Sequence, residues 1–240
     1  MEVTERELRR MVDDVEDVHR QGMATMGTDI AELHNGEGKR LMDSSRRRFL
    51  AGAGLGGLGL VVGSAMVPWR RLTGPAFAQV SGDAGIAAFA ESVELAAVAA
   101  YEAAGQTGKV TTPAVLDAAT TFAMQHQEHA AAFGGAAGEA ATGEANPGLV
   151  EEIAPQIQAA PDEAAILEIA FSLENAAAST YLFALGALES TAALQLTASI
   201  LPVESQHAVV IGAVLGKPAT AYVPTFETQE DAISPEEFPV

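Results

Sequence analysis

The sequence predicts an all-α fold in which four long helices form a bundle of two helical hairpins joined by one long crossover. Four Ala-rich apolar stretches follow residue 80, and each is long enough for roughly five or more helical turns. Clusters of Gly, Pro and Thr separate these stretches, and none of them shows the alternation of a strand. The links within each pair are short, whereas about twenty-five residues (136–160) separate the two pairs, a connectivity known for four-helix bundles.

The ends of the predicted helices carry recognisable stop and start signals. The four helices are expected over residues 83–104, 112–135, 161–187 and 190–215. Thr112 supplies an N-cap to the second helix, with Pro113 in its first turn. Asp162 and Glu163 open the third helix, where acidic side chains suit the helix dipole, and Gly216 closes the fourth.

The two hairpins resemble each other in sequence. The first and third helices each contain a Glu followed seven residues later by a Tyr, and these motifs begin at Glu94 and Glu174. The second and fourth helices each carry one motif that ends in His, at His129 and His207. The spacing between equivalent positions is 80 residues for the Glu pair and 78 for the His pair, counted from the sequence. This near-constant register indicates a duplicated hairpin.

The chain divides into four segments, of which only the third is a globular domain. They are a charged N-terminal lead (1–44), a twin-arginine signal segment (45–78), the four-helix bundle (79–216) and an acidic, extended C-terminal tail (217–240). The lead contains an apolar spacing at Leu8, Met11, Val12 and Val15 that predicts a short amphipathic helix. No role is assigned to the two histidines of the lead, His19 and His34.

The signal segment predicts export through the twin-arginine translocase. Residues 45–50 read Ser-Arg-Arg-Arg-Phe-Leu and precede a weakly apolar, Gly-rich run over 51–67. Ala76-Phe77-Ala78 then has the small residues that a signal peptidase needs, so the mature chain is expected to start at Gln79. The expected location is periplasmic, extracellular or in the cell envelope, and an uncleaved membrane anchor is the alternative.

Charge and cysteine content exclude several classes of partner. From residue 79 onward the chain has 2 basic residues, Lys109 and Lys217, against 21 acidic ones, which gives a formal charge of −19. Such a surface repels nucleic acid phosphates and anionic membranes. The chain has no Cys, which excludes disulfides and thiolate metal sites. The expected partners are therefore metal ions, the translocase during export and, where the chain self-associates, further copies of itself.

Carboxylates and imidazoles at helical spacing predict a metal site in the bundle core. Glu204 and His207 lie three residues apart on one helix face, so both side chains can point at one ion. Glu94 and Glu174 lie in otherwise apolar stretches, where a buried acid needs a partner. Carboxylates from two helices and histidines from the other two are the ligands of di-iron and di-manganese bundle sites.

Several neighbouring side chains are expected outside this ligand set. Tyr101 and Tyr181 are interpreted as helix-packing aromatics, with radical or electron-relay groups as the alternative. Phe122 and Met124 are interpreted as core residues. Glu91 is expected to be solvated or to lie just outside the ligands.

Four motifs of the chain resemble the ferritin-like family that includes the bacterial secreted and desiccation-related ferritin-like proteins. They read Phe-Ala-Glu-Ser-Val-Glu at 89–94, Ser-Leu-Glu-Asn at 172–175, Ile-Leu-Pro-Val-Glu-Ser-Gln-His at 200–207 and Val-Pro-Thr-Phe-Glu at 223–227. The resemblance covers about residues 82–228 and implies a ferritin-like bundle with affinity for iron. It also implies that five residues hold metal positions, namely Glu94, His129, Glu174, Glu204 and His207.

One position departs from the family pattern. Where the family has Glu-x-x-His on the second helix, residues 126–129 read His-Gln-Glu-His, so His126 stands at the position of an acid and joins the candidate metal ligands. Glu128 lies about 100° around the helix from His129 and is expected on the flank. The exchange removes one negative charge and one bridging carboxylate, which weakens the case for two-iron oxidase chemistry.

Two functions follow from this set of residues. The first is an exported ferritin-like protein that binds Fe or Mn, with two ions as the full complement, and acts in iron oxidation, iron storage or protection against oxidative stress. The alternative is a non-catalytic cell-envelope or stress protein with a degenerate or single-ion site, which His126 favours. A carrier of lipids or small molecules between the Ala-rich helices has no support beyond the helix packing itself.

Overall fold

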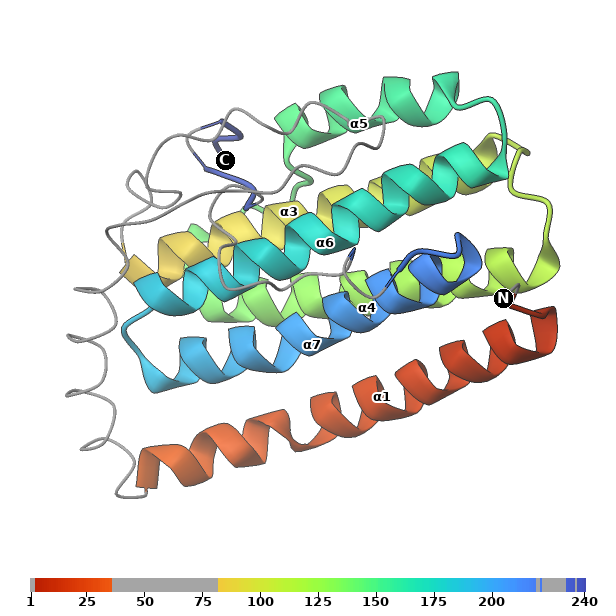
Figure 1. The fold of residues 1–240 in the computed structure, drawn as a ribbon. Coiled ribbons are helices and arrows are strands. Elements are labelled where there is room, and N and C mark those ends of the chain that lie inside the picture. The colour runs from red at the N-terminus through yellow and green to blue at the C-terminus, as the bar shows by residue number, and fades with distance from the viewer. Residues whose placement is uncertain (1–2, 36–81, 219–220, 222–231, 236) are drawn as a thin grey trace.

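The computed structural model describes residues 3–35, 82–218, 221, 232–235 and 237–240. This part of the chain is helical and contains no strand, which confirms the predicted all-α class. Figure 1 shows four long helices lying side by side, with α1 along one side of the bundle and α5 on the opposite side. The twin-arginine motif, the Gly-rich run and the cleavage site predicted for residues 45–78 lie outside the described residues.

The four bundle helices agree with the predicted ranges to within two residues at each end. They are α3 (Gly82–Gln106), α4 (Pro113–Ala137), α6 (Glu163–Ala187) and α7 (Thr191–Val214). Helix α3 makes its most extensive contacts with α4, and α6 makes its most extensive contacts with α7, as expected for two hairpins. Helix α3 is long and apolar enough to cross a membrane, but more than half of that stretch is buried inside the bundle, as in a core helix.

Side chains at the helix ends explain where these helices begin. Asp162 accepts a hydrogen bond from the backbone N–H of Ala165 (2.9 Å) and caps α6, and Ser190 caps α7 in the same way. Thr112 is the N-cap residue of α4 but makes no side-chain cap; its hydroxyl instead donates to Glu163 (2.7 Å). The start of α4 is thereby tied to the start of α6. Gly216, with φ of +68°, follows the end of α7 as predicted.

The crossover between the hairpins contains a helix that the sequence analysis did not predict. Helix α5 (Pro147–Ala159) begins with Asn146, whose side chain accepts from the N–H of Leu149 (3.2 Å). Its buried residues Leu149, Ile153 and Ile157 repeat every four positions and face α3. Asn-Pro followed by this apolar spacing is an ordinary helix signal, which the Gly and Pro content of the segment obscured. Helix α5 covers one side of the bundle (Figure 1).

Helix α1 (Glu5–Asn35) is much longer than the short helix expected in the N-terminal lead, and it packs on α4 and α7. Leu8, Val12 and Val15 are buried in this contact. Arg9 of α1 forms an ion pair with Asp117 of α4. The lead therefore contributes a fifth long helix to the bundle, because its apolar stripe faces apolar surface of the second hairpin and of α4.

The described part of the C-terminal tail also lies against the bundle. The backbone N–H of Ile233 donates to the Thr180 hydroxyl (2.7 Å), and the Asn146 amide donates to the carbonyl of Phe238 (2.9 Å). Ile233 and Phe238 are both buried. The end of the chain is thus fastened to α6 and to the start of α5.

Candidate metal centre

Six titratable side chains from the four bundle helices meet in the bundle core, and each exposes 2% or less of its surface. They are Glu94 of α3, His126 and His129 of α4, Glu174 of α6, and Glu204 and His207 of α7. The two pairs at i, i+3 spacing point inward from one helix face each. The structure therefore brings together all six residues that the sequence analysis named as candidate ligands.

The six side chains form two overlapping groups, each able to surround one ion. Each residue of a group offers one ligand atom, and the four ligand atoms of a group all lie within 4.8 Å of one another. The first group is Glu94, His126, His129 and Glu204, and the second is His126, Glu174, Glu204 and His207. Glu204 and His126 belong to both. A carboxylate shared between two adjacent positions is the arrangement by which bundle proteins bridge a metal pair.

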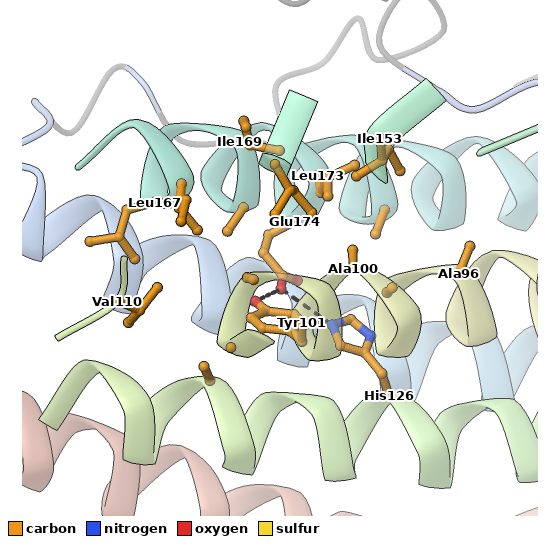
Figure 2. A pocket seen from close by; sticks show the side chains of 18 of the residues that line it. Ala96, Ala100, Tyr101, Val110, His126, Ile153, Leu167, Ile169, Leu173 and Glu174 are labelled. Atoms are coloured by element: carbon orange, nitrogen blue, oxygen red, sulfur yellow. Dashed lines mark hydrogen bonds and ion pairs between the residues drawn. The ribbon is translucent and has the colours of Figure 1, made fainter. Parts of the chain in front are cut away.

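His126 lies between the two carboxylates that the repeat motif supplies. Its Nδ1 is 2.6 Å from Glu94 Oε2, and its Nε2 is 3.2 Å from Glu174 Oε1. Figure 2 shows the ring beside Glu174 and Tyr101. One imidazole thus touches an acid from each hairpin, in the place where the family pattern has an acid that could bridge two ions.

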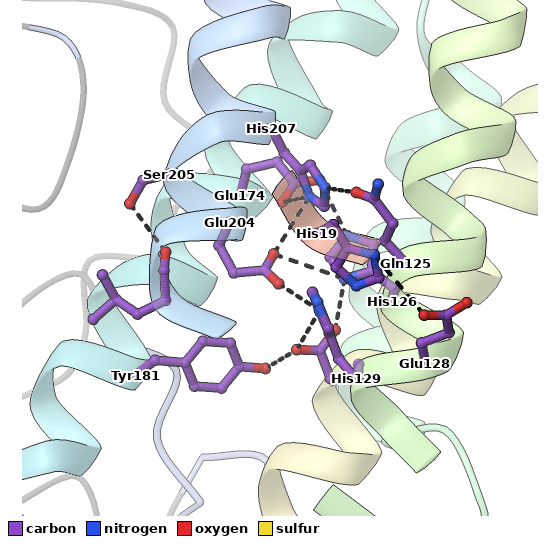
Figure 3. Close-up of polar contacts among 12 residues, drawn as sticks. His19, Gln125, His126, Glu128, His129, Glu174, Tyr181, Glu204, Ser205 and His207 are labelled. Carbon is purple, nitrogen blue, oxygen red and sulfur yellow. Dashed lines mark hydrogen bonds and ion pairs between the residues drawn. The ribbon is translucent and has the colours of Figure 1, made fainter. Parts of the chain in front are cut away.

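Buried polar atoms without hydrogen-bond partners lie on the other side of the centre. Neither carboxylate oxygen of Glu204 and neither ring nitrogen of His129 makes a hydrogen bond among the described residues, although both side chains are fully buried. His129 Nδ1 lies 2.9 Å from Glu204 Oε1, outside hydrogen-bond geometry, and Figure 3 shows the two groups facing each other. Buried polar atoms of this kind need a partner, and a metal ion fits this donor set.

Opposite charges at the centre shift the pKa values of its acids and bases apart. Burial raises the pKa of Glu94, but the imidazoles of His129 and His126 outweigh burial and lower this pKa to about 2. Burial lowers the pKa of His129, but the carboxylates of Glu94 and Glu204 overcome this effect and raise it to about 9. Without an ion, this side of the centre is held by imidazolium–carboxylate pairs.

The Glu174 side of the centre behaves in the same way. Burial opposes ionisation of Glu174, yet the imidazoles of His126 and His207 hold its pKa well below the usual value. Burial is likewise overcome at His126 and His207, whose pKa values the surrounding carboxylates raise. An ion that enters must displace these ring protons, since a ligating imidazole is neutral.

Two tyrosines that pack in the bundle as expected also donate hydrogen bonds to the acidic ligands. The hydroxyl of Tyr101 donates to Glu174 Oε1 and that of Tyr181 donates to Glu94 Oε1. Burial and the nearby carboxylates raise the pKa of both hydroxyls well above the usual value, so both stay protonated donors. In each pair the tyrosine and the glutamate belong to different hairpins, so the repeated Glu and Tyr hold each other in place across the bundle.

Helix α1 reaches the centre through a chain of hydrogen bonds that the sequence analysis did not find. Gln125 Oε1 lies 2.6 Å from His207 Nε2, and the amide nitrogen of Gln125 donates to Glu16 of α1 (2.7 Å). This arrangement assigns the ring proton of His207 to Nε2 and leaves Nδ1 facing the acids.

His19 is a second contribution of α1 that was missed. It is 3% exposed, and its ring centre lies 5.1 Å from that of His129. Burial and the charge of His129 lower its pKa to about 4, so the ring is neutral. The signal was present in the sequence, because His19 continues the apolar stripe of Leu8, Val12 and Val15 at helical spacing.

Four other neighbours can now be placed. Phe122 is buried as expected and stacks on the ring of His207 at 4.1 Å, whereas the expectation of a core Met124 is wrong, because that side chain is 55% exposed. Glu128 lies on the flank, with 56% of its side chain exposed. Glu91 is buried outside the ligand set and accepts from the backbone N–H of Thr142 (2.9 Å).

Comparison with known proteins gives the class to which this fold and site belong. The model of the ferritin-like domain matches residues 82–217, which is more than half of the chain and contains all six candidate ligands. The chain therefore belongs to the ferritin-like family. No curated protein and no solved structure matches it significantly.

Proposed function

We propose that this chain is an exported ferritin-like protein that binds Fe or Mn at two adjacent positions of the bundle core, one ion firmly and a second more weakly. The proposed roles are iron oxidation, iron storage or protection against oxidative stress. The observation that carries the proposal is the pair of four-residue donor groups that share Glu204 and His126. Two buried groups of carboxylate and imidazole donors in contact suit a pair of first-row metal ions.

The residues of the centre have distinct tasks in this function. Glu204 makes no hydrogen bond among the described residues and belongs to both donor groups, so its carboxylate would be the ligand that two ions share. Tyr101 and Tyr181 orient Glu174 and Glu94, and Gln125 keeps Nδ1 of His207 available. When bound, a pair of Fe(II) ions would supply the two electrons that, with two protons, reduce dioxygen to hydrogen peroxide. Complete burial of the six ligands keeps bulk water from this reaction.

Metal stoichiometry of the full-length protein tests the proposal. Anaerobic titration with Fe(II) is expected to fill one position firmly and a second at higher concentration, and air should then produce Fe(III). Glu204→Ala should abolish the second position and weaken the first, whereas the control Glu128→Ala removes an exposed acid of α4 and should leave both unchanged. Wild-type protein that takes up no Fe(II) or Mn(II) would sink the proposal.

The second candidate is a non-catalytic stress or envelope protein, and His126 is the observation that favours it. A protonated His126 already neutralises part of the charge of Glu94 and Glu174 by direct contact, which lessens the need for a second ion. One firmly bound ion without Fe(II) oxidation in air would select this candidate.

Export rests on the arginine motif at 45–50 and the small residues at 76–78. Folded export lets a protein take its metal in the cytoplasm, where availability selects the ion more than affinity does. Replacing Arg46 and Arg47 by Lys should leave a folded, metal-bearing precursor in the cytoplasm. A variant that is exported as efficiently as the wild type would show that another route is used.

A further inference from the structure

An apolar cavity of about 60 Å³ lies beside the metal centre, between α3, α4, α5 and α6. This volume is several times the roughly 10–15 Å³ that one water-sized molecule requires. Aliphatic side chains and alanines form nearly all of its wall (Figure 2), and the larger aliphatic residues include Val93, Leu149, Ile153, Ile157, Leu167 and Ile169. The unpredicted crossover helix α5 supplies three of these six side chains.

The cavity runs beside the metal centre (Figure 2). Its only polar lining residues in the described part of the chain are Tyr101, His126 and Glu174. These three contact one another, since Tyr101 donates to Glu174 and His126 Nε2 lies 3.2 Å from the same carboxylate oxygen. A molecule in the cavity would therefore meet the Glu174 side of the centre and not the His129 side.

A surface residue joins the cavity wall to the solvent. Leu116 near the start of α4 lines the cavity and is 38% exposed. Val110, just before α4, lies at the end of the cavity away from the centre in Figure 2. The cavity wall thus includes partly exposed apolar surface near the start of α4 and also includes Glu174.

The lining and the volume select the occupant. A hydrated ion or hydrogen peroxide would lose hydrogen bonds on entry, because the aliphatic wall offers none in return. Apolar cavities of about 150 Å³ stay dry and bind benzene or xenon, so a cavity of less than half that volume suits an apolar molecule of one or two heavy atoms. Dioxygen belongs to this class, whereas hydrocarbon chains and aromatic rings are too large.

We infer that the cavity is a binding site for a small apolar gas, and that it brings dioxygen to the Glu174 side of the metal centre. The inference rests on the proposed function for the role of dioxygen as oxidant, but not for the binding of gas. It narrows that function, because the apolar lining makes dioxygen, and not hydrogen peroxide, the oxidant that this cavity admits.

Xenon is the probe that tests the site without any metal. Metal-free, full-length protein is expected to bind one xenon atom in the cavity, seen as a saturable ¹²⁹Xe shift in solution and as a xenon peak beside Glu174 in pressurised crystals. Ala100 lines the cavity and is buried, so Ala100→Leu should fill it and weaken xenon binding by about tenfold or more, and the smaller Ala100→Val should weaken it less. The control Ala132→Leu enlarges a half-buried alanine of α4 outside the cavity and should bind xenon as the wild type does.

Fe(II) oxidation then tests the role of dioxygen. Ala100→Leu should oxidise Fe(II) several-fold more slowly with dioxygen, while Fe(II) affinity and the rate with hydrogen peroxide stay as in the wild type. Absence of a xenon site in the wild type, or equal xenon binding by Ala100→Leu, overturns the cavity as a gas site. An unchanged rate with dioxygen overturns its role in supply. Xenon binding in a protein that takes up no metal would uphold the gas site while rejecting the proposed metal function.

Discussion

At the scale of single residues, the chemistry of the centre depends on what stands between Glu94 and Glu174. His126 contacts both acids, and its ring has two nitrogens but no negative charge. A carboxylate at this position could bridge two cations and reduce their repulsion, which an imidazole does less well. The second metal position is therefore expected to be the weaker one.

Replacing His126 by Glu should strengthen the second position. We expect His126→Glu to raise the occupancy from about one ion to two and to speed Fe(II) oxidation, because the added carboxylate restores the negative charge. Metal stoichiometry and the rate of Fe(III) formation at one pH are the measurements. His126→Gln is the matched control of similar shape without the charge, and it should show no gain. Two firmly bound ions and fast oxidation in the wild type would contradict this prediction and make His126 a competent ligand.

Tyr181 should matter for metal affinity although it is not a ligand. Tyr181→Phe removes the donor to Glu94 Oε1 and leaves the ring in its buried place. Loss of such a support costs about 10–100-fold in metal affinity in other metal sites, and the same range is expected here. Competition with a chelator measures it. An affinity equal to that of the wild type, with the fold intact by circular dichroism, would leave Tyr181 with its packing role alone.

At the scale of helices, α1 and α5 close two sides of the centre. Helix α1 lies over α4 and α7 and reaches the ligands through Glu16 and His19. Helix α5 covers the apolar cavity. Cleavage at the predicted site after Ala78 would remove α1, so the precursor would have a closed histidine side and the mature protein an open one.

A charge in the apolar stripe of α1 tests whether that helix closes the centre. Val12 is buried against the bundle, so Val12→Asp should detach α1, because an unpaired carboxylate is strongly disfavoured there. We expect amide hydrogens of α1 to exchange faster and bound metal to pass to a chelator about tenfold faster or more, as for other opened sites. Val18→Asp is the control on the same helix, at a site 53% exposed. Equal metal release from both variants would mean that α1 does not limit access.

At the scale of the whole molecule, three acids and three imidazoles fully inside a strongly acidic protein link its stability to pH. The folded protein holds the pKa of Glu94 near 2 against a usual value of 4.5, and that of His129 near 9 against 6.5. The ionised Glu94 carboxylate therefore adds to the free energy of unfolding above pH 4.5, and this stabilisation is lost as the pH falls through 2. The protonated His129 ring adds to the free energy of unfolding below pH 6.5, and this stabilisation is lost as the pH rises through 9.

Metal-free protein should therefore be most stable between about pH 4.5 and 6.5. His19 acts in the opposite sense, because its pKa is lowered to about 4 in the folded protein. It therefore destabilises the fold as the pH falls below 6.5, which narrows the pH range of greatest stability from the acidic side without removing it. Urea unfolding across the pH range measures the profile. Metal-loaded protein should keep its stability above pH 9, because ligating imidazoles are already neutral. A metal-free protein with its greatest stability above pH 9 would contradict the paired protonation described for the centre.

The sequence alone determined the bundle and the residue types of its centre. The periods of four apolar stretches and their cap residues are local signals, so the bounds of the four bundle helices were predicted to within two residues. The repeated Glu and His spacing, together with the resemblance to the ferritin-like family, named all six candidate ligands. Local signals also suggested a helix in the lead, but they could not say what it packs against.

Only the tertiary structure decided which faces meet. It placed His126 between two acids, gave the packing residues Tyr101 and Tyr181 carboxylates to donate to, and put Met124 on the surface. It also set α1 and α5 against the bundle and left an apolar cavity beside Glu174. These features join residues far apart in the chain, and helical period fixes a side chain's direction around its own helix but not the neighbour that it will touch.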